Sequence, residues 1–282
     1  MQSSLLDSPL GPIEYALQGQ GFPILVSHGA AGGFDQALLI AAPLAADGFR
    51  IVAPSRDGYL RSPLAPASSP QTQADKYAWL LDRLGLDSCA IMGVSVGGPS
   101  AIEFALRHPR CCKALVLISS IVTPVRPAYL SFLPEPLVRS FLKSPAYRLV
   151  LTRTPDRILL RILGVTSQDE RRASSDTVAA HALRETVLAA RDPQGLRALG
   201  ALADITSARH LPQYPFADIQ MPVLAVHGSK DRFAPFRFIA DAIAAMPHAR
   251  LQKITAAGHL CILTHSNQVS SQVTRFLRTV AN

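Results

Sequence analysis

The ten residues Cys89-Ala90-Ile91-Met92-Gly93-Val94-Ser95-Val96-Gly97-Gly98 decide the fold prediction for this chain. The uncharged run at 89–92 is typical of a buried strand, and residues 96–107 have the apolar spacing of a helix. Ser95 therefore falls on a sharp turn from a strand into a helix. Gly93 and Gly97 keep side chains out of that strained turn. The free N–H groups of the helix N-terminus favour negative charge on an oxygen that reacts there.

Five more apolar runs lie between turn signals along the chain. We expect buried strands there, because Val, Ile and Leu occupy both faces; the runs are residues 24–27, 50–53, 114–119, 223–226 and 250–254. Helical periodicity fills most of the intervals between them, at residues 35–47, 71–84, 236–246 and 261–280. This alternation predicts an α/β fold with a mostly parallel, doubly wound sheet and helices on both faces.

The interval 122–218 breaks this alternation. It contains Arg- and Leu-rich helical patterns interrupted by prolines, and no convincing strand. The strand pattern resumes directly after it, so the interval is best explained as an insertion between two strands. We therefore expect a core made of residues 1–121 and 219–282, with a helical cap, or lid, at 122–218.

A serine needs a base, oriented by a third group, before it becomes a good nucleophile. His259 is the candidate base, because it follows the last predicted strand and so lies at the carboxyl edge of the sheet. Asp231 is the candidate for the third group, since it follows the strand at 223–226 and the loop after 114–119 offers no acid. His265 falls inside the last helical stretch, where we expect a surface residue.

The chain order Ser95, Asp231, His259 resembles that of the α/β-hydrolase superfamily, and the resemblance covers essentially the whole chain. Three more segments resemble family motifs: the oxyanion-hole loop His28-Gly29-Ala30-Ala31-Gly32-Gly33, the G-Y-G-R-S turn at Gly58-Tyr59-Leu60-Arg61-Ser62, and the G-x-x-D-x-x-x-P acid loop at 228–235. Leu60 departs from the second motif, which has a glycine there. The resemblance implies an α/β-hydrolase fold with a catalytic triad of Ser95, Asp231 and His259.

An oxyanion hole needs two hydrogen-bond donors. The backbone N–H of Val96, directly after the nucleophile, is the expected first donor. The resemblance implies that Ala30, in the loop after the first predicted parallel strand, supplies the second. It also implies that His28 braces this loop and does not act as a base.

The expected activity is hydrolysis of a small hydrophobic ester through an acyl-enzyme, because the triad alone performs it. Serine at position 95 argues against dehalogenases and epoxide hydrolases of this fold, which use an aspartate. C–C bond hydrolases, lactonases and perhydrolases stay open, although C–C hydrolases commonly have a tryptophan soon after the catalytic histidine and the one tryptophan here is Trp79. A receptor-like ligand-binding protein that retains the triad is the alternative from another class.

The cap is expected to roof the substrate pocket. Its Leu, Phe and Val content, with Phe34 beside the oxyanion loop, favours a hydrophobic acyl or alcohol site. Arginines spaced along the cap are usually solvated, but an acidic substrate could instead meet Arg126, Arg139, Arg153, Arg157 and Arg161.

Composition and charge argue against several other classes of protein. The net charge of +8 is spread along the chain, which does not favour nucleic-acid binding. No apolar run is long enough for a membrane span and no signal peptide is recognisable, so we expect a cytoplasmic protein whose partner is a small-molecule substrate. The four cysteines have neither zinc-site nor disulfide-scaffold spacing and are expected to be reduced. No metal or organic cofactor is implied, and the sequence sets no oligomeric state.

Overall fold

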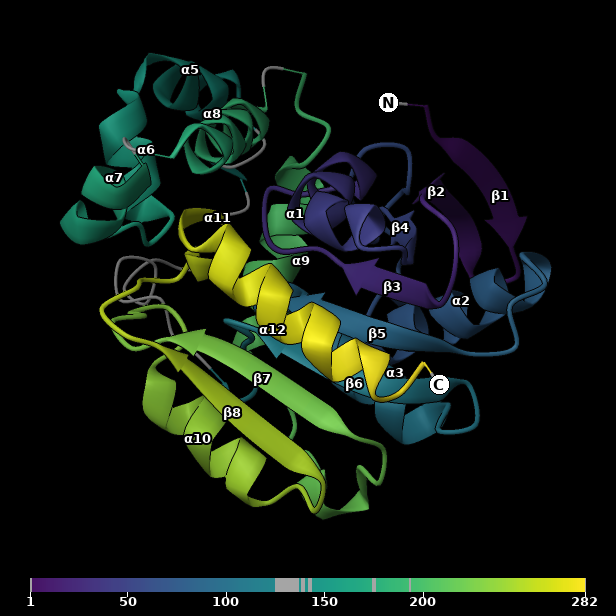
Figure 1. Cartoon of the computed structure of the whole chain (residues 1–282). Coiled ribbons are helices and arrows are strands. Elements are labelled where there is room, and N and C mark those ends of the chain that lie inside the picture. The colour runs from purple at the N-terminus through teal and green to yellow at the C-terminus, as the bar shows by residue number, and fades with distance from the viewer. Residues whose placement is uncertain are drawn as a thin grey trace.

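A computed structural model describes residues 2–124, 137, 140–141, 144–173, 176–192 and 194–281 of the chain. Its centre is a sheet of eight strands in the order β1-β2-β4-β3-β5-β6-β7-β8 (Figure 1). The strands are β1 (Ser4–Ser8), β2 (Gly11–Gln18), β3 (Pro23–Ser27), β4 (Arg50–Pro54), β5 (Cys89–Val94), β6 (Cys112–Ile118), β7 (Val223–Gly228) and β8 (Ala249–Ile254).

The strands from β3 onward pair in parallel, and β5 lies in the interior of the sheet. In its register Ile91 pairs with Leu25 on one side and with Leu115 on the other. All six predicted strands are present, which confirms the predicted α/β fold with a mostly parallel sheet. The antiparallel strands β1 and β2 were not predicted, because β1 is largely exposed and β2 buries only part of its length.

Helices cover both faces of the sheet, as expected. One face is covered by α1 (Phe34–Ala46) and α12 (Ser266–Arg278), which pack over one core cluster. The other is covered by α2 (Pro70–Arg83), α3 (Gly98–Arg107) and α10 (Phe236–Ala244), which share a second cluster. The single helix expected at 261–280 is two helices, α11 (Cys261–Thr264) and α12.

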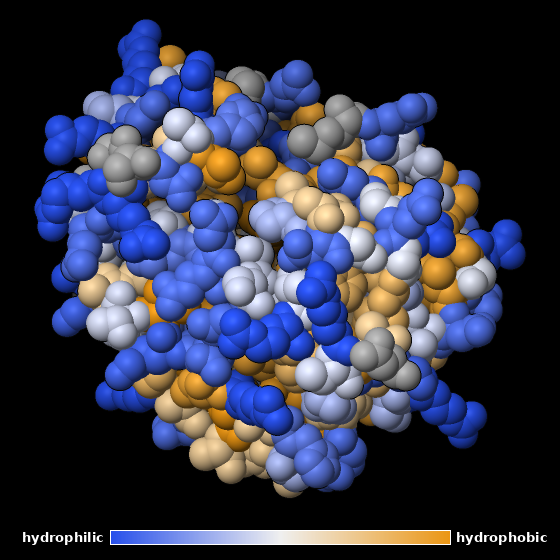
Figure 2. Space-filling model, viewed as in Figure 1, coloured by the Kyte–Doolittle hydropathy of each residue, from blue (hydrophilic) through white to orange (hydrophobic). Residues whose placement is uncertain are grey.

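Between β6 and β7 the described residues form helices and no strand. The helices are α5 (Pro145–Arg153), α6 (Asp156–Ile162), α7 (Ser167–Ala173), α8 (Thr177–Arg191) and α9 (Ala198–Arg209), and we call them the cap. They fall inside the interval expected for the insertion, and α5 to α8 gather beside α11 (Figure 1). Val178 and Leu188 of α8 are exposed hydrophobic residues. Figure 2 shows hydrophobic patches among the mostly hydrophilic residues of this face of the molecule. None of the helices in the described parts of the chain has the length and apolarity needed to cross a lipid bilayer.

Candidate active site

Ser95 occupies the turn between β5 and α3, where a short 3₁₀ turn, Ser95–Gly97, joins the two elements. Its φ is 53°, a left-handed conformation that is strained for a residue with a side chain. The two glycines of the turn allow close approach of other segments. A Cβ on Gly97 would lie 2.2 Å from the carbonyl oxygen of Ser27, and one on Gly93 would lie 2.8 Å from the Ala101 Cβ.

Three side chains from separate loops form a continuous chain of hydrogen bonds. The Ser95 hydroxyl lies 2.8 Å from Nε2 of His259, and Nδ1 of His259 lies 2.8 Å from Oδ2 of Asp231. The carboxylate can only accept, so Nδ1 carries the proton and Nε2 is left to accept from the serine. This is the geometry required of a nucleophile, a base and a group that orients the base.

Asp231 is held as a buried carboxylate. Its Oδ1 accepts hydrogen bonds from the backbone N–H groups of Phe233 and Ala234, at 2.9 and 3.0 Å. Burial acts to raise the pKa of Asp231, but the charge of His259 and the contact with His227 outweigh it and hold that pKa well below its usual value. The carboxylate is therefore ionised at neutral pH and can stabilise an imidazolium at His259.

His227, at the end of β7, is a second histidine beside this acid that the sequence reasoning did not single out. Its Nε2–H donates to the carbonyl oxygen of Ala234 at 2.6 Å, and the same nitrogen lies 3.2 Å from Oδ2 of Asp231. Histidine and aspartate lie four residues apart in the acid loop, His227-Gly228-Ser229-Lys230-Asp231, and this spacing was the only available signal.

The loop after β3 lies against the serine. A Cβ on Gly29 would be 3.4 Å from the Cβ of Ser95. His28 fixes this loop, because its Nδ1–H donates to the Gly29 carbonyl at 2.8 Å and its Nε2 accepts the Arg56 backbone N–H at 2.9 Å. Burial, aided by the charge of Arg56, holds the pKa of His28 well below its usual value. His28 is thus neutral, and both of its ring nitrogens are engaged in hydrogen bonds, as expected of a residue that braces the loop.

Val96, the residue after the serine, lies between an apolar cluster and a cleft with polar residues in its lining. Val96 packs against a small buried cluster drawn from the β6 loop, the acid loop and the end of α9, which consists of Ile121, Ala208, Leu211 and Ala234. A narrow cleft beside Val96 runs between α9 and the N-terminal ends of α2 and α3, and Arg56 and Asp204 are among the residues that line it. Phe34, the first residue of α1, is buried in the core cluster of that face.

The other candidate positions have no hydrogen bond to Ser95 among those described. Arg153, Arg157 and Arg161 are exposed on the cap helices, whereas Arg126 and Arg139 lie outside the described residues. The prediction that His265 is a surface residue was wrong: its side chain is 10% exposed, because the chain breaks there between α11 and α12 and turns the ring toward Asp169.

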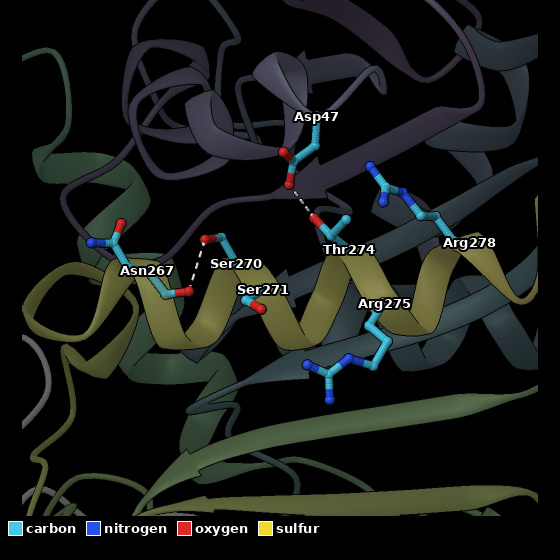
Figure 3. A pocket seen from close by; sticks show the side chains of 7 residues that line it. All are labelled: Asp47, Asn267, Ser270, Ser271, Thr274, Arg275 and Arg278. Carbon is cyan, nitrogen blue, oxygen red and sulfur yellow. Dashed lines mark hydrogen bonds between the residues drawn. The ribbon is translucent and has the colours of Figure 1, made fainter.

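A wide polar groove elsewhere on the molecule is not part of this site. It runs along α12 beside Asp47, and the serine and arginine side chains of the helix line it (Figure 3). Ser95, Asp231 and His259 are not among its lining residues. Within the described residues, no group of three or more His, Cys, Asp or Glu side chains is arranged to hold a metal ion.

The model of one protein family, described as alpha/beta hydrolase fold, matches residues 23–266 of the chain. The chain belongs to this family. The Pseudomonas putida protein 2-hydroxy-6-oxononadienedioate/2-hydroxy-6-oxononatrienedioate hydrolase 2 is 30% identical to this α/β hydrolase over 240 residues, which are 84% of this chain and 79% of that protein. The uncharacterised hydrolase YcgS of Bacillus subtilis is 36% identical over 111 residues, a match that spans 39% of each chain.

The fold agrees with solved structures over nearly the full length. An α/β hydrolase fold protein from Nakamurella multipartita has a TM-score of 0.79 and 26% sequence identity, and the match covers 98% of this chain and 99% of that one. The family prediction made from the sequence motifs is therefore confirmed.

Proposed function

We propose that this α/β hydrolase cleaves small hydrophobic esters through an acyl-enzyme formed on Ser95. The observation that carries the proposal is the hydrogen-bond chain from Ser95 through His259 to Asp231, with both distances at 2.8 Å. Such a chain converts a weak nucleophile into a strong one without a metal or an organic cofactor.

In the first half of the reaction Oγ of Ser95 attacks the ester carbonyl carbon while Nε2 of His259 takes the hydroxyl proton. The tetrahedral intermediate then breaks its bond to the alcohol oxygen, and the imidazolium of His259 returns the proton to that leaving group. In the second half His259 removes a proton from water, which attacks the acyl carbon and releases the acid and free Ser95. The Asp231 carboxylate stabilises the imidazolium in both halves.

Two backbone N–H groups are proposed to stabilise the oxyanion. Val96 follows the nucleophile directly, and Ala30 lies in the loop that packs against Ser95.

An uncharged ester fits the surroundings better than a dicarboxylate does. The P. putida relative is named for a dienedioate, so C–C bond hydrolysis of such a compound is the second candidate function. A dianionic substrate calls for cations beside the serine. Arg56 lines the nearby cleft, but both of its terminal nitrogens bind the carboxylate of Asp204 at 2.6 Å. The apolar cluster around Val96 instead suits a short acyl or alkyl group, including that of a lactone or a peracid precursor.

Steady-state turnover of a matched substrate panel tests the proposal. The panel contains short-chain p-nitrophenyl esters, a lactone and a 2-hydroxy-6-oxo-dienedioate, with a fluorophosphonate as the covalent probe for Ser95. We expect labelling of Ser95 and a higher kcat/KM for the esters than for the dienedioate. Preference for the dienedioate would replace the proposal with the C–C hydrolase alternative, and labelling without turnover of any compound would favour a ligand-binding protein.

A further inference from the structure

The cap contacts the loop that carries His259 through two consecutive backbone groups. The N–H of His259 donates to the carbonyl oxygen of Gly164 at 3.1 Å, and the N–H of Gly258 donates to Oδ2 of Asp169 at 3.0 Å. Gly164 lies in the connection between α6 and α7. Asp169 lies in α7, which packs beside α11. Both acceptors thus come from the segment inserted between β6 and β7, and both donors come from the core loop that bears the proposed base.

Asp169 is almost fully buried, with 1% of its surface exposed. It forms a capping box at the start of α7: its Oδ2 accepts the Thr166 backbone N–H at 2.9 Å, and its own N–H donates to the Thr166 hydroxyl at 3.1 Å. The bond to Gly258 is additional to this local role. Burying a carboxylate costs free energy unless it is hydrogen-bonded. Capping α7 does not by itself require this burial, so the contact of Asp169 with another loop needs a further explanation.

The second carboxylate oxygen reaches the C-terminal end of α11, the short helix that follows the His259 loop. Oδ1 of Asp169 lies 3.4 Å from the Thr264 hydroxyl and 3.8 Å from Nδ1 of His265, where α11 meets α12. One side chain of the cap therefore touches the core on both sides of His259, at the residue before it and at the helix junction after it. A base held on both sides has little freedom to move away from Ser95.

The fit between the two segments is close enough to require glycine on both sides. A Cβ on Gly258 would lie 2.3 Å from the Gly164 carbonyl oxygen and 2.9 Å from Oδ2 of Asp169. A Cβ on Gly164, whose φ is +85°, would lie 2.6 Å from the Cβ of His259. The absence of a side chain at Gly164 thus lets the cap backbone lie directly against Cβ of His259, the first atom of the side chain proposed to act as the base.

We propose that Asp169 is a positioning residue, through which the cap holds the His259 loop at the distance from Ser95 that proton transfer requires. The inference rests on the proposed role of His259 as the base. Without the Asp169 carboxylate the Gly258 N–H loses its acceptor, the loop relaxes, and the Ser95–His259 bond lengthens in a large fraction of molecules. The cap then contributes to the chemical step as well as roofing the substrate.

Three variants separate positioning from stability. Asp169→Ala removes the acceptor, whereas Asp169→Asn keeps an amide oxygen that can accept from Gly258. Asp176→Ala is the matched control, since Asp176 caps α8 by accepting the N–H groups of Val178 and Ala179 and has no contact with the His259 loop among its hydrogen bonds. All are measured at a temperature where circular dichroism shows them to be folded.

For Asp169→Ala we expect kcat on a p-nitrophenyl ester to fall on the order of 10- to 100-fold with KM nearly unchanged, because a displaced base affects the transition state. Asp169→Asn is expected to restore most of this loss, and Asp176→Ala to keep wild-type kcat. The rate of fluorophosphonate labelling at Ser95 should follow the same order. A rise in KM alone, or equal losses in the Ala variants at 169 and 176, would overturn the proposal.

If Asp169→Ala does not fold, Gly164→Ala tests the same contact from the backbone side, with Gly85→Ala as control because Gly85 also has a positive φ but has no atom within 4 Å of its added Cβ. The proton NMR signal of the His259 Nδ1–H distinguishes this proposal from the proposed function. It should shift or broaden in Asp169→Ala whatever substrate the wild type uses, and an unchanged signal would contradict positioning. Absence of ester turnover in the wild type, with the signal still altered in the variant, would overturn the proposed function alone.

Discussion

Arg56 of the core and Asp204 of the cap form a bidentate ion pair, in which both nitrogen–oxygen distances are 2.6 Å. The two side chains are only 6% and 9% exposed, and Tyr59 donates a further hydrogen bond to the same carboxylate. Since the Arg56 backbone N–H also holds His28, this pair connects the cap to the proposed oxyanion loop. The cap is thus tied to the core here as well as at Asp169.

Asp204→Ala is expected to lower the free energy of unfolding by about 3–5 kcal/mol, because it leaves a buried guanidinium without its partner. Urea unfolding measures the loss. The matched control is Asp75→Ala, which breaks the contacts of Asp75 with Arg107 and His108 at a site where the Asp75 and Arg107 side chains are 30% and 43% exposed. These exposed contacts should contribute no more than about 1 kcal/mol. Equal losses in the two variants would mean that the buried pair adds nothing of its own.

Acid should destabilise the fold through His28. Its pKa is lowered in the folded protein by burial and by Arg56, so below the unfolded pKa of about 6.5 the unfolded chain binds a proton that the folded chain does not. Stability therefore falls as the pH drops below that value, by up to about 1.4 kcal/mol per pH unit for this one group. Unfolding free energies at pH 7.5 and 5.5 should differ less in His28→Asn than in the wild type. An identical difference would show that another group carries the pH dependence.

Asp231→Asn is expected to reduce kcat by about 10⁴ while the protein stays folded, because the amide can no longer hold the His259 tautomer or stabilise its imidazolium. Ester hydrolysis at saturating substrate measures the change. Asp241→Asn is the control, since Asp241 is an exposed carboxylate on α10, the helix that follows the same loop. Near wild-type kcat in Asp231→Asn would mean that a different carboxylate serves His259.

The sequence was sufficient for the parts of the fold that local pattern determines. Continuous Val, Ile and Leu runs identify strands buried on both faces, and the glycines around Ser95 identify the turn. The strands β1 and β2 were not predicted, because the edge strand β1 is largely exposed and its neighbour β2 is only partly buried, so neither contains such a run. The break between α11 and α12 at His265 was not predicted, because the helical periodicity of the sequence continues across it.

The contacts of the cap could not have been predicted from the sequence. Asp169 and Gly258 lie 89 residues apart, and Arg56 and Asp204 lie 148 apart. Nothing in the composition of α7 or α9 distinguishes these two aspartates from the exposed Asp156 of α6, because their roles depend on which core loop each helix meets. Such pairings are set by tertiary packing, which a single sequence does not encode in any local pattern.

The most direct test of the central claim is the hydrolysis of a short-chain p-nitrophenyl ester by the wild type and by Ser95→Ala. The serine is the only group in the proposed mechanism that forms a bond to the substrate, so its removal ends acyl-enzyme formation. We predict steady turnover and fluorophosphonate labelling in the wild type and loss of both in the variant, with its thermal unfolding unchanged. Wild-type turnover by Ser95→Ala would contradict the account.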